Sequence, residues 1–384
     1  MRWTWKFPQM STHIRTAKWP VSWSESKAFG DRISLALTSS WPAQHFKSFT
    51  DLFKSRHYAG PDDLFFAVEE LPAMGKEYWF LYFCAPPGEE QVVVTAGRSV
   101  DPVKVNRTAV ETGKEPATLD HHPDSVSCAT VCWYHGKKRQ VAIDSSAQVH
   151  VEKKGRENVL CIRHGDNEVV ISGRYPKFAI SLIKDGSEKF TARAFPPKTG
   201  LPYEKVHLLK NPIAPRLGAA MVNYYFDFEG KLEGKPLRGK AYLQKVVAVM
   251  PLAPWNWVRV HFAKGAVIDF FAGKPFGDQK PSMHFASNDF FEVEGHRVRL
   301  GGVRLDSWLE GDKRKWLLHG PNVMLAMESY SLQNFSMKQK TKFQYDEYLV
   351  RVTDFVYEHG HTKYTLAELG GGVGLVEDAS GYLI

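Results

Sequence analysis

The sequence predicts an all-β protein built from two tandem antiparallel β-barrels that pack together, with a few short helices. Two observations lead to this prediction. Short segments rich in β-branched and aromatic residues recur at close intervals, separated by Gly, Pro, Asp and Asn. The chain has 384 residues, 43% of them hydrophobic and 13% aromatic, which is more than one all-β unit of ordinary size needs. We therefore expect two domains.

The first half of the chain reads as a meander of antiparallel strands. Its first two strands flank the segment 85–90, whose Pro and Gly residues suit a hairpin turn. Further turns are expected at 153–156, 164–167 and 184–187. The strands expected in this half are 78–84, 91–96, 131–134, 141–144, 148–152, 159–163, 168–172, 178–183 and 190–195.

One helix is predicted near the N-terminus. Ser40 can cap it and Pro42 suits its first turn. Phe46, Phe49 and Phe53 then fall on one face at helical spacing. We expect this helix to plug or cover the first barrel.

Proline marks the expected domain boundary. The segments 195–202 and 211–215 are too rich in proline for the interior of a sheet. They divide the chain into an N-terminal domain, 1–200, and a C-terminal domain, 201–384. The strands expected in the second half are 221–228, 241–250, 257–263, 266–271, 289–294, 296–300, 316–318, 323–330, 341–343, 347–357 and 374–377. Closure of such long sheets removes their edges and leaves an interior to fill or to use.

The net charge of +8 is spread along the chain. Basic runs such as 137–139 and 153–154 fall in predicted turns, where solvated tips are expected. Because no nucleic-acid-binding motif is recognisable, nucleic acid is not an expected partner, whereas peripheral association with an anionic membrane surface stays open.

The sequence also indicates where the protein resides. No apolar run approaches the roughly 20 residues of a transmembrane segment, and the N-terminus lacks the apolar stretch of a secretory signal. A cytoplasmic location is therefore expected. In that reducing compartment we expect the four cysteines to be free packing thiols.

Neither a metal nor a cofactor is predicted. The segments 119–124 and 358–361 have the composition of metal clusters, but adjacent or turn-borne histidines rarely complete a ligand shell alone. The glycine-rich run 370–374 is followed by too little chain for the helix that a phosphate-binding loop requires.

The most distinctive segment of the sequence is 238–262. Strand alternation places three of its side chains on one face of a strand, namely Tyr242, Gln244 and Val246. It places four more on one face of the next strand, namely Trp255, Trp257, Arg259 and His261. Flat apolar rings with polar tips are typical of ligand pockets, so this segment is predicted to line a cavity for a bulky, mostly apolar ligand. The alternative is that the tryptophan pair packs between the two halves.

This segment also carries a family resemblance. Gly239-x-x-Tyr242, a proline-rich turn, Trp255-x-Trp257 and a His-Phe strand ending at Gly265 resemble the lipocalin-like superfamily of carotenoid 1,2-hydratases and AttH domains. The closing segment 368–377 is similar to the last strand of those proteins. In fold, the resemblance extends to lipocalin-like Diels-Alderases and tocopherol cyclases.

The resemblance implies two calyx-like barrels with a ligand near their junction, and relatives that hydrate isoprenoids or guide pericyclic cyclisation of polyketides. One departure concerns the chemistry. The hydratases carry Asp-His two and three residues after the matching Tyr, where this chain has Gln244 and Lys245. Hydration requires protonation of an alkene, and the amide of Gln cannot supply that proton.

An acid from another part of the chain would be needed. Five acidic residues lie in apolar β-like runs where burial would raise the pKa, namely Asp227, Asp269, Asp289, Glu328 and Glu377. The alternative is that they point to solvent on alternating strands. Our hypothesis is that Asp269 or Glu328 is the buried acid.

The sequence thus predicts a protein that binds a bulky isoprenoid, polyene or lipid-like molecule in a barrel cavity, with cofactor-free isomerase, cyclase or hydratase-type chemistry. Its candidate catalytic residues are Gln244, Asp269 and Glu328. Its candidate ligand-binding residues are Tyr242, Trp255, Trp257, Arg259 and His261. The alternatives are a non-catalytic carrier of hydrophobic ligands and a module with filled barrels that interacts through its basic surface.

Overall fold

The computed structural model describes residues 60–68, 71–72, 74–106, 108–110, 126–198, 207–210, 217–274, 283–284 and 289–383. The predicted helix that starts at Ser40 and the histidine-containing segment 119–124 lie outside these ranges. Within them the prediction of an all-β protein is confirmed. The described helices are the short α3 (Pro61–Phe65) and α4 (Leu366–Leu369). In this part of the chain, no helix has the length and apolarity needed to cross a membrane.

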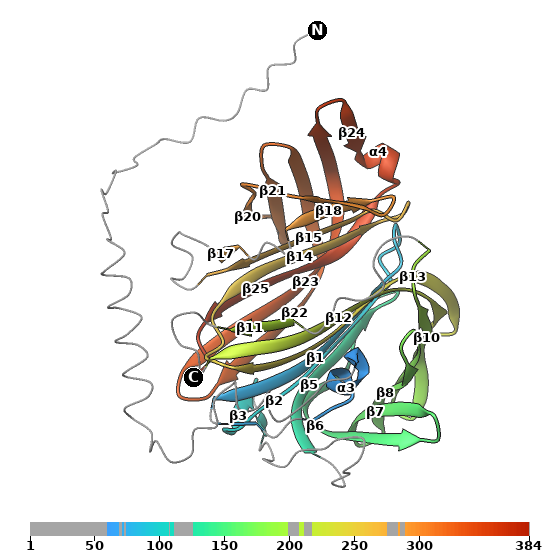
Figure 1. The fold of residues 1–384 in the computed structure, drawn as a ribbon, viewed down its shortest axis with the longest axis vertical. Helices are drawn as coiled ribbons and strands as arrows, with labels where there is room; N and C mark the ends of the chain where they lie inside the picture. The colour runs from blue at the N-terminus through green and yellow to red at the C-terminus, as the bar shows by residue number, and fades with distance from the viewer. Residues whose placement is uncertain are drawn as a thin grey trace. The chain divides into compact units, whose positions relative to one another are not determined.

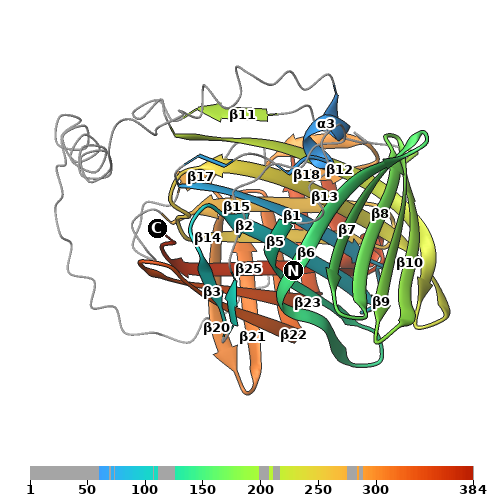
Figure 2. The same ribbon diagram turned by 90° about the horizontal axis from the view of Figure 1, so that it is seen from below.

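Eleven of the described strands form the first sheet (Figures 1 and 2). They are β1 (Gly75–Cys84), β2 (Gln91–Ser99), β5 (Val126–His135), β6 (Arg139–Lys154), β7 (Glu157–His164), β8 (Asn167–Arg174), β9 (Lys177–Lys184), β10 (Ser187–Phe195), β11 (His207–Lys210), β12 (Gly218–Leu232) and β13 (Lys235–Val249). Their order is β10-β9-β8-β7-β6-β5-β2-β1-β13-β12-β11. The meander expected from sequence is thus present.

A pairing between β10 and β12 closes the first sheet. It runs from Phe190 opposite Leu232 to Phe195 opposite Asp227. Because β12 also pairs with β13, the hydrogen bonds from β12 through β13, β1, β2 and β5 to β10 form a ring, with β11 outside it. Closure satisfies the backbone groups that a sheet edge would leave unpaired.

Thirteen described strands form the second sheet (Figure 1). They are β3 (Val103–Val105), β4 (Thr108–Val110), β14 (Trp255–Phe262), β15 (Val267–Gly273), β17 (Met283–His284), β18 (Phe290–Val293), β19 (His296–Arg299), β20 (Arg304–Glu310), β21 (Lys313–His319), β22 (Val323–Lys338), β23 (Lys342–His359), β24 (Thr362–Thr365) and β25 (Gly372–Gly381). Its main order is β19-β18-β15-β14-β25-β23-β22-β21-β20.

Alternation along the strands separates three apolar cores. The inward side chains of the first sheet, such as Trp79, Leu81 and Leu243, form one core. Val258, Val260 and other side chains on one face of the second sheet form another. The third core joins the outer face of the first sheet to the opposite face of the second. We call this third core the seam; it is the part of the fold that positions the candidate site.

Sheet membership changes later in the chain than the predicted boundary near residue 200. The strands β12 and β13 follow that boundary, yet they pair within the first sheet. The change falls instead between Val249 and Trp255, whereas β3 and β4 from the first half belong to the second sheet. The division into domains at residue 200 stays a prediction.

Gly230 tests the closure of the first sheet. It lies in the β10 to β12 pairing, where an added Cβ would come within 1.8 Å of the backbone oxygen of Thr191. We expect Gly230→Ala to lower the free energy of unfolding by about 1–3 kcal/mol, because the backbone must move to admit the methyl group. Urea denaturation measures this loss. Gly301→Ala is the control, because nothing lies within 4 Å of its added Cβ; equal stability of the two variants would contradict tight closure at Gly230.

Candidate functional site

The candidate site lies in the seam. Both sheets contribute large buried side chains to it, including Phe80, Tyr82 and Trp133 from the first and Trp257 and Tyr345 from the second. In the described part of the chain no strand of one sheet pairs with a strand of the other. Contacts of side chains therefore join the two sheets here.

The two strand faces singled out in the sequence meet in this seam. On β13, Tyr242 faces the seam, whereas its neighbours Ala241 and Leu243 belong to the core of the first sheet. The ring centroid of Trp257 lies 5.3 Å from that of Tyr242 and 5.4 Å from that of Phe80. This agrees with the alternative that tryptophan packs between the halves. The ligand-binding role of these residues stays a prediction.

Gln244 continues the seam face of β13. Its Nε2 donates to the hydroxyl of Tyr242 at 2.8 Å and to Oδ1 of Asn223 at 2.9 Å. The hydroxyl of Tyr242 donates to the same Oδ1 at 2.9 Å. The amide of Gln244 is thus fixed by its neighbours as a polar contact at the end of the aromatic cluster.

Arg259 and Asp269 form a buried ion pair on the second sheet. Trp257 donates from Nε1 to Oδ1 of Asp269 at 3.0 Å. The guanidinium carbon of Arg259 lies 4.6 Å and 4.5 Å from the ring centroids of Tyr225 and Tyr242. Although burial acts against the charge of Arg259, Asp269 raises its pKa. Asp269 is held as the carboxylate of this pair and is a poor proton donor.

Lys245 points away from the seam, into the interior of the first sheet. Its Nζ lies 2.6 Å from Glu77 Oε2 and 3.0 Å from the ring centroid of Trp79. Arg98 also pairs with Glu77. Burial acts to raise the pKa of Glu77, but the two cations hold it below its ordinary value. These charges neutralise one another inside the first sheet and lie on the side of β13 away from the site.

A pair of buried glutamates occupies the centre of the seam. Glu347 on β23 and Glu377 on β25 are direct cross-strand partners, so both face the same side of the sheet. Glu347 Oε2 accepts from Trp133 Nε1 at 2.8 Å, and its Oε1 accepts from Thr95 Oγ1 at 2.9 Å. Both donors come from the first sheet. Glu347 therefore ties the two sheets together.

The hydroxyl of Tyr345 bridges the two carboxyl groups. Its oxygen lies 2.8 Å from Glu347 Oε1 and 2.7 Å from Glu377 Oε1. A phenol has one proton and can donate to one acceptor only, so the second contact requires a carboxyl group that itself donates. Among the residues that the structure describes, Glu377 has one further donor, Trp255 Nε1 at 2.6 Å. Because Glu347 receives more donors, we assign the carboxylate to Glu347 and the proton to Glu377.

Burial also favours a retained proton. It raises the pKa of Glu347 to about 7, although hydrogen bonds from Trp133, Tyr345 and Thr95 oppose this. It raises the pKa of Glu377 to about 8, and the charge of Glu347 adds to this effect. The pair thus holds a proton near neutral pH, where an ordinary carboxyl group has lost it.

The other sequence-predicted acids lie elsewhere. Glu328 is a partly buried residue of β22, where a hydrogen bond from Lys313 lowers its pKa. Asp227 pairs with Lys240 in a half-exposed position. Asp289 is buried and accepts from the backbone nitrogen of Phe271 at 3.2 Å. The structure thus brings Asp269 and Glu377 into the seam, whereas Glu328 pairs with Lys313 and Arg351. The catalytic roles of Asp269, Glu328 and Gln244 stay predictions.

Sequence reasoning missed Glu347, the more highly hydrogen-bonded member of the pair. A signal was present, because Glu347 alternates with the apolar side chains of Tyr345 and Leu349, although the predicted strand began only at residue 347. A charged residue in phase with buried ones indicates a buried charge. The contribution of Trp133 and Thr95 could not be read in this way, because they lie more than 200 residues away.

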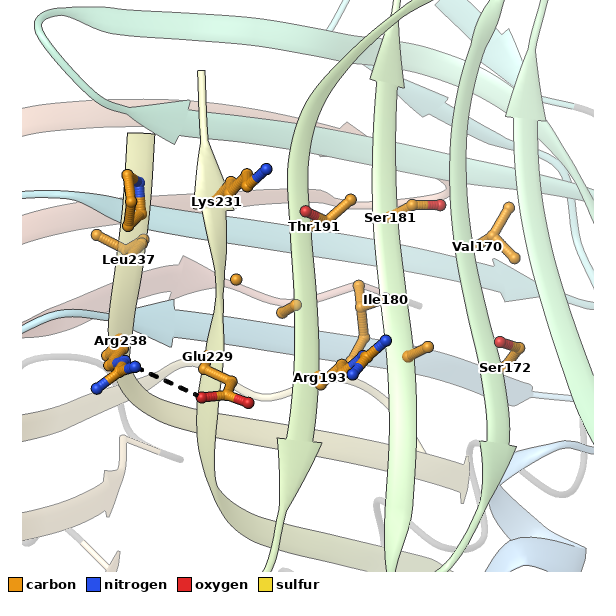
Figure 3. Close-up of a pocket in the computed structure, with 14 residues that line it drawn as sticks. Val170, Ser172, Ile180, Ser181, Thr191, Arg193, Glu229, Lys231, Leu237 and Arg238 are labelled. Atoms are coloured by element: carbon orange, nitrogen blue, oxygen red, sulfur yellow. Dashed lines mark ion pairs between the residues drawn. The ribbon is translucent and has the colours of Figure 1, made fainter. Parts of the chain in front are cut away.

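An open cleft lies at a different place, over β8, β9, β10, β12 and β13 (Figure 3). It has a volume of about 550 Å³, and Ser172, Thr191 and Arg193 are among the residues that line it. Its one ion pair joins Arg238 to Glu229 at 4.0 Å, with both side chains largely exposed. Exposed pairs contribute little to binding or stability. The buried, chemically distinctive groups are in the seam, so we place the candidate site there.

No protein-family model matches the chain, and no curated protein matches it. Solved structures similar to it include that of CghA with Sch210972, with 10% identity over 79% of this chain and 88% of that chain and a TM-score of 0.41. A putative AttH protein from Nitrosomonas europaea has 12% identity over 81% and 93%, with a TM-score of 0.38. Kievitone hydratase from Nectria haematococca has 11% identity over 88% and 94%, with a TM-score of 0.37.

The shared proton predicts a pH dependence of stability. A carboxyl group whose pKa is raised in the folded state holds a proton that the unfolded chain has lost between about pH 4.3 and the folded pKa. The free energy of unfolding therefore falls as the pH rises through this window, by at most about 1.4 kcal/mol per pH unit for each such proton. With a pKa of about 8 for Glu377, the loss extends to mildly alkaline pH.

Glu377→Gln tests this dependence, because its amide resembles the protonated carboxyl and stays neutral. We expect the variant to lose less stability than the parent between about pH 5.5 and about pH 8.5, measured by urea denaturation. Glu358→Gln, on an exposed part of β23, should keep the parent's dependence. A parent-like slope in Glu377→Gln would contradict the assignment of the proton.

Proposed function

We propose that this protein binds a bulky, mostly apolar small molecule in the seam and that Glu377 protonates it in cofactor-free isomerase, cyclase or hydratase-type chemistry. The observation that carries the proposal is the single hydroxyl of Tyr345 between two buried carboxyl groups. It implies a stored proton in apolar surroundings, which is what protonation of a double bond requires.

The simplest reaction is isomerisation. The O–H bond of Glu377 breaks as its proton forms a C–H bond with one alkene carbon, which leaves a carbocation and a carboxylate. Loss of a proton from a neighbouring carbon to that carboxylate forms the shifted double bond and restores the acid. Trp255 and Trp257 on β14 lie beside Glu377 on β25. The faces of their rings would stabilise the cation.

Capture of the same cation by a hydroxyl group of the ligand gives cyclisation, and capture by water gives hydration. In each case the acid is regenerated when the adding oxygen loses its proton. The position of the carboxylate Glu347, one hydroxyl away, supports this return of the proton. No cofactor enters these steps.

Ligand entry is compatible with the packing around the acid pair. Trp255 and Phe271 are half-buried, and their ring centroids lie 6.4 Å apart in a stacked arrangement. Tyr78 is also half-buried, and its pKa is raised by burial and by the charge of Glu377. These partly exposed rings offer an apolar approach to Glu377 from solvent.

Deuterium exchange tests the proposal. The purified protein is incubated in D₂O with a panel of isoprenoids, polyenes and unsaturated fatty acids, and each ligand is recovered for mass spectrometry. A protonating site introduces deuterium at carbon, and we expect Glu377→Gln to slow this by about 10²–10⁴-fold. Tryptophan fluorescence measures binding in the same samples, and the amide variant should still bind.

Two comparisons sharpen the result. Glu358→Gln should exchange at the parent's rate, whereas Glu328→Gln tests the acid predicted from sequence and should also leave exchange intact. Binding without exchange in the parent would contradict the enzymatic part and favour the non-catalytic carrier. Absence of binding by the whole panel would contradict the ligand class.

A further inference from the structure

A row of three side chains crosses the seam two rows beyond the acid pair. Arg351 on β23 pairs with Val373 on β25, and Val373 pairs with His261 on β14. Directly paired residues face the same side of a sheet, and Val373 belongs to the seam. Two strand spacings separate the outer members, which places their Cα atoms roughly 10 Å apart. His261 and Arg351 therefore flank Val373 on the face of the second sheet that is turned toward the first sheet.

The protonation of His261 follows from its contact with Arg259. Nε of Arg259 donates to Nε2 of His261 at 3.2 Å, so Nε2 is an acceptor. A neutral imidazole with an accepting Nε2 carries its proton on Nδ1. Burial, and then the charge of Arg259, lower the pKa of His261 well below its ordinary value, so the ring is neutral. His261 thus presents an N–H donor at Nδ1.

This donor is buried and lacks a partner. His261 is 3% exposed, and its Nδ1 has no hydrogen-bond partner among the described residues. Arg351 differs, because its partly exposed side chain pairs with Glu89 through Nη1 at 2.9 Å and lies 3.7 Å from Glu328 through Nε, although this Nε makes no hydrogen bond. Ser331, a neighbour on β22, likewise has an unpaired buried hydroxyl. Buried polar atoms are nearly always paired, so the unpaired Nδ1 of His261 indicates a group that completes it.

We propose that His261 and Arg351 bind a carbonyl oxygen at the polar end of the ligand. This inference rests on the proposed function and names the ligand class more closely. Two N–H donors require an acceptor. A neutral carbonyl suits them better than a carboxylate, because Glu89 already neutralises Arg351, Glu328 lies 3.7 Å from its Nε, and His261 is uncharged.

The distance along β25 between the acid and the donor row indicates how long the ligand is. Glu377 and Val373 are four residues apart, which corresponds to roughly 13 Å in an extended strand. Leu375 lies between them, beside its cross-strand partner Leu349, and both are fully buried. The seam thus presents an acid, an apolar row and a donor row in succession. The ligand it fits is an elongated apolar molecule with a ketone or aldehyde roughly 13 Å from the double bond that receives the proton.

Matched ligands test the carbonyl contact. Axerophthene, retinal and retinoic acid share one polyene and end in a methyl, aldehyde and carboxylate group; β-carotene and canthaxanthin differ by ketone oxygens. Dissociation constants are measured by quenching of tryptophan fluorescence in detergent micelles. We expect the carbonyl compound of at least one series to bind about tenfold more tightly than its hydrocarbon, the size of one good hydrogen bond. Retinoic acid should bind less tightly than retinal.

Two variants of His261 distinguish the contributions of its two ring nitrogens to binding. The side-chain amide of His261→Asn can place N–H where Nδ1 stood, whereas the amide of His261→Gln reaches only the place of Nε2. We expect the Asn variant to keep the carbonyl preference and the Gln variant to lose it. Arg351→Gln should weaken the preference, and Arg299→Gln, an exposed residue of β19, should leave it unchanged.

Each outcome decides the inference. Equal affinities for the carbonyl and hydrocarbon ligands in the parent, or a carbonyl preference that survives His261→Gln, would overturn the contact. Tighter binding of retinoic acid would overturn the carbonyl in favour of a carboxylate. A carbonyl preference without deuterium exchange would support the contact and refute the catalytic role of Glu377. No binding by either series would overturn both proposals.

A ligand-independent measurement checks the tautomer. In ¹⁵N-labelled protein, the side-chain resonances of His261 should report a protonated Nδ1 and an unprotonated Nε2. The Nδ1 resonance should shift when retinal is added and stay in place when axerophthene is added. A protonated Nε2 in the free protein would remove the donor on which the inference depends.

Discussion

The seam depends on one requirement, which is that carboxyl groups buried between two sheets must be neutralised or hydrogen-bonded. Glu347 meets it with donors from both sheets, Trp133 and Thr95 on one side and Tyr345 on the other. Glu377 meets it by keeping a proton. The same contacts that hold the sheets together therefore also create an acid in apolar surroundings, so structure and chemistry share one set of atoms.

A second buried charge is handled differently. Arg259 has Asp269 as its counterion and two tyrosine rings as its walls, so its charge is retained. In the described part of the chain no such cation contacts the acid pair, and a proton takes that role. This contrast separates a carboxylate that stabilises the fold from a carboxyl group that can give up a proton, although both lie on the same face of the second sheet.

Much of the fold could be predicted from sequence because strand alternation is a local property. Alternation predicted that the side chains from Trp255 to His261 share one face of β14, which is the face in the seam. The turn residues predicted the meander of the first sheet. Sheet membership is different, because it depends on pairing partners far apart in the chain. The pairing of β1 with β13 places residues 75–84 beside 240–249, and no local pattern reports such a contact.

The sequence by itself determined the all-β class and the strand faces around Tyr242 and Trp257, and it placed Gln244 and Lys245 where the family resemblance implies an acid pair. Only the tertiary structure decided how each carboxyl group is buried and paired. The ionisation of a carboxyl group depends on its depth of burial and on the donors and charges within a few ångströms. Glu328, Asp269 and Glu377 all lie in similar apolar runs, yet cations pair with the first two, whereas burial and the charge of Glu347 raise the pKa of the third so that it keeps its proton.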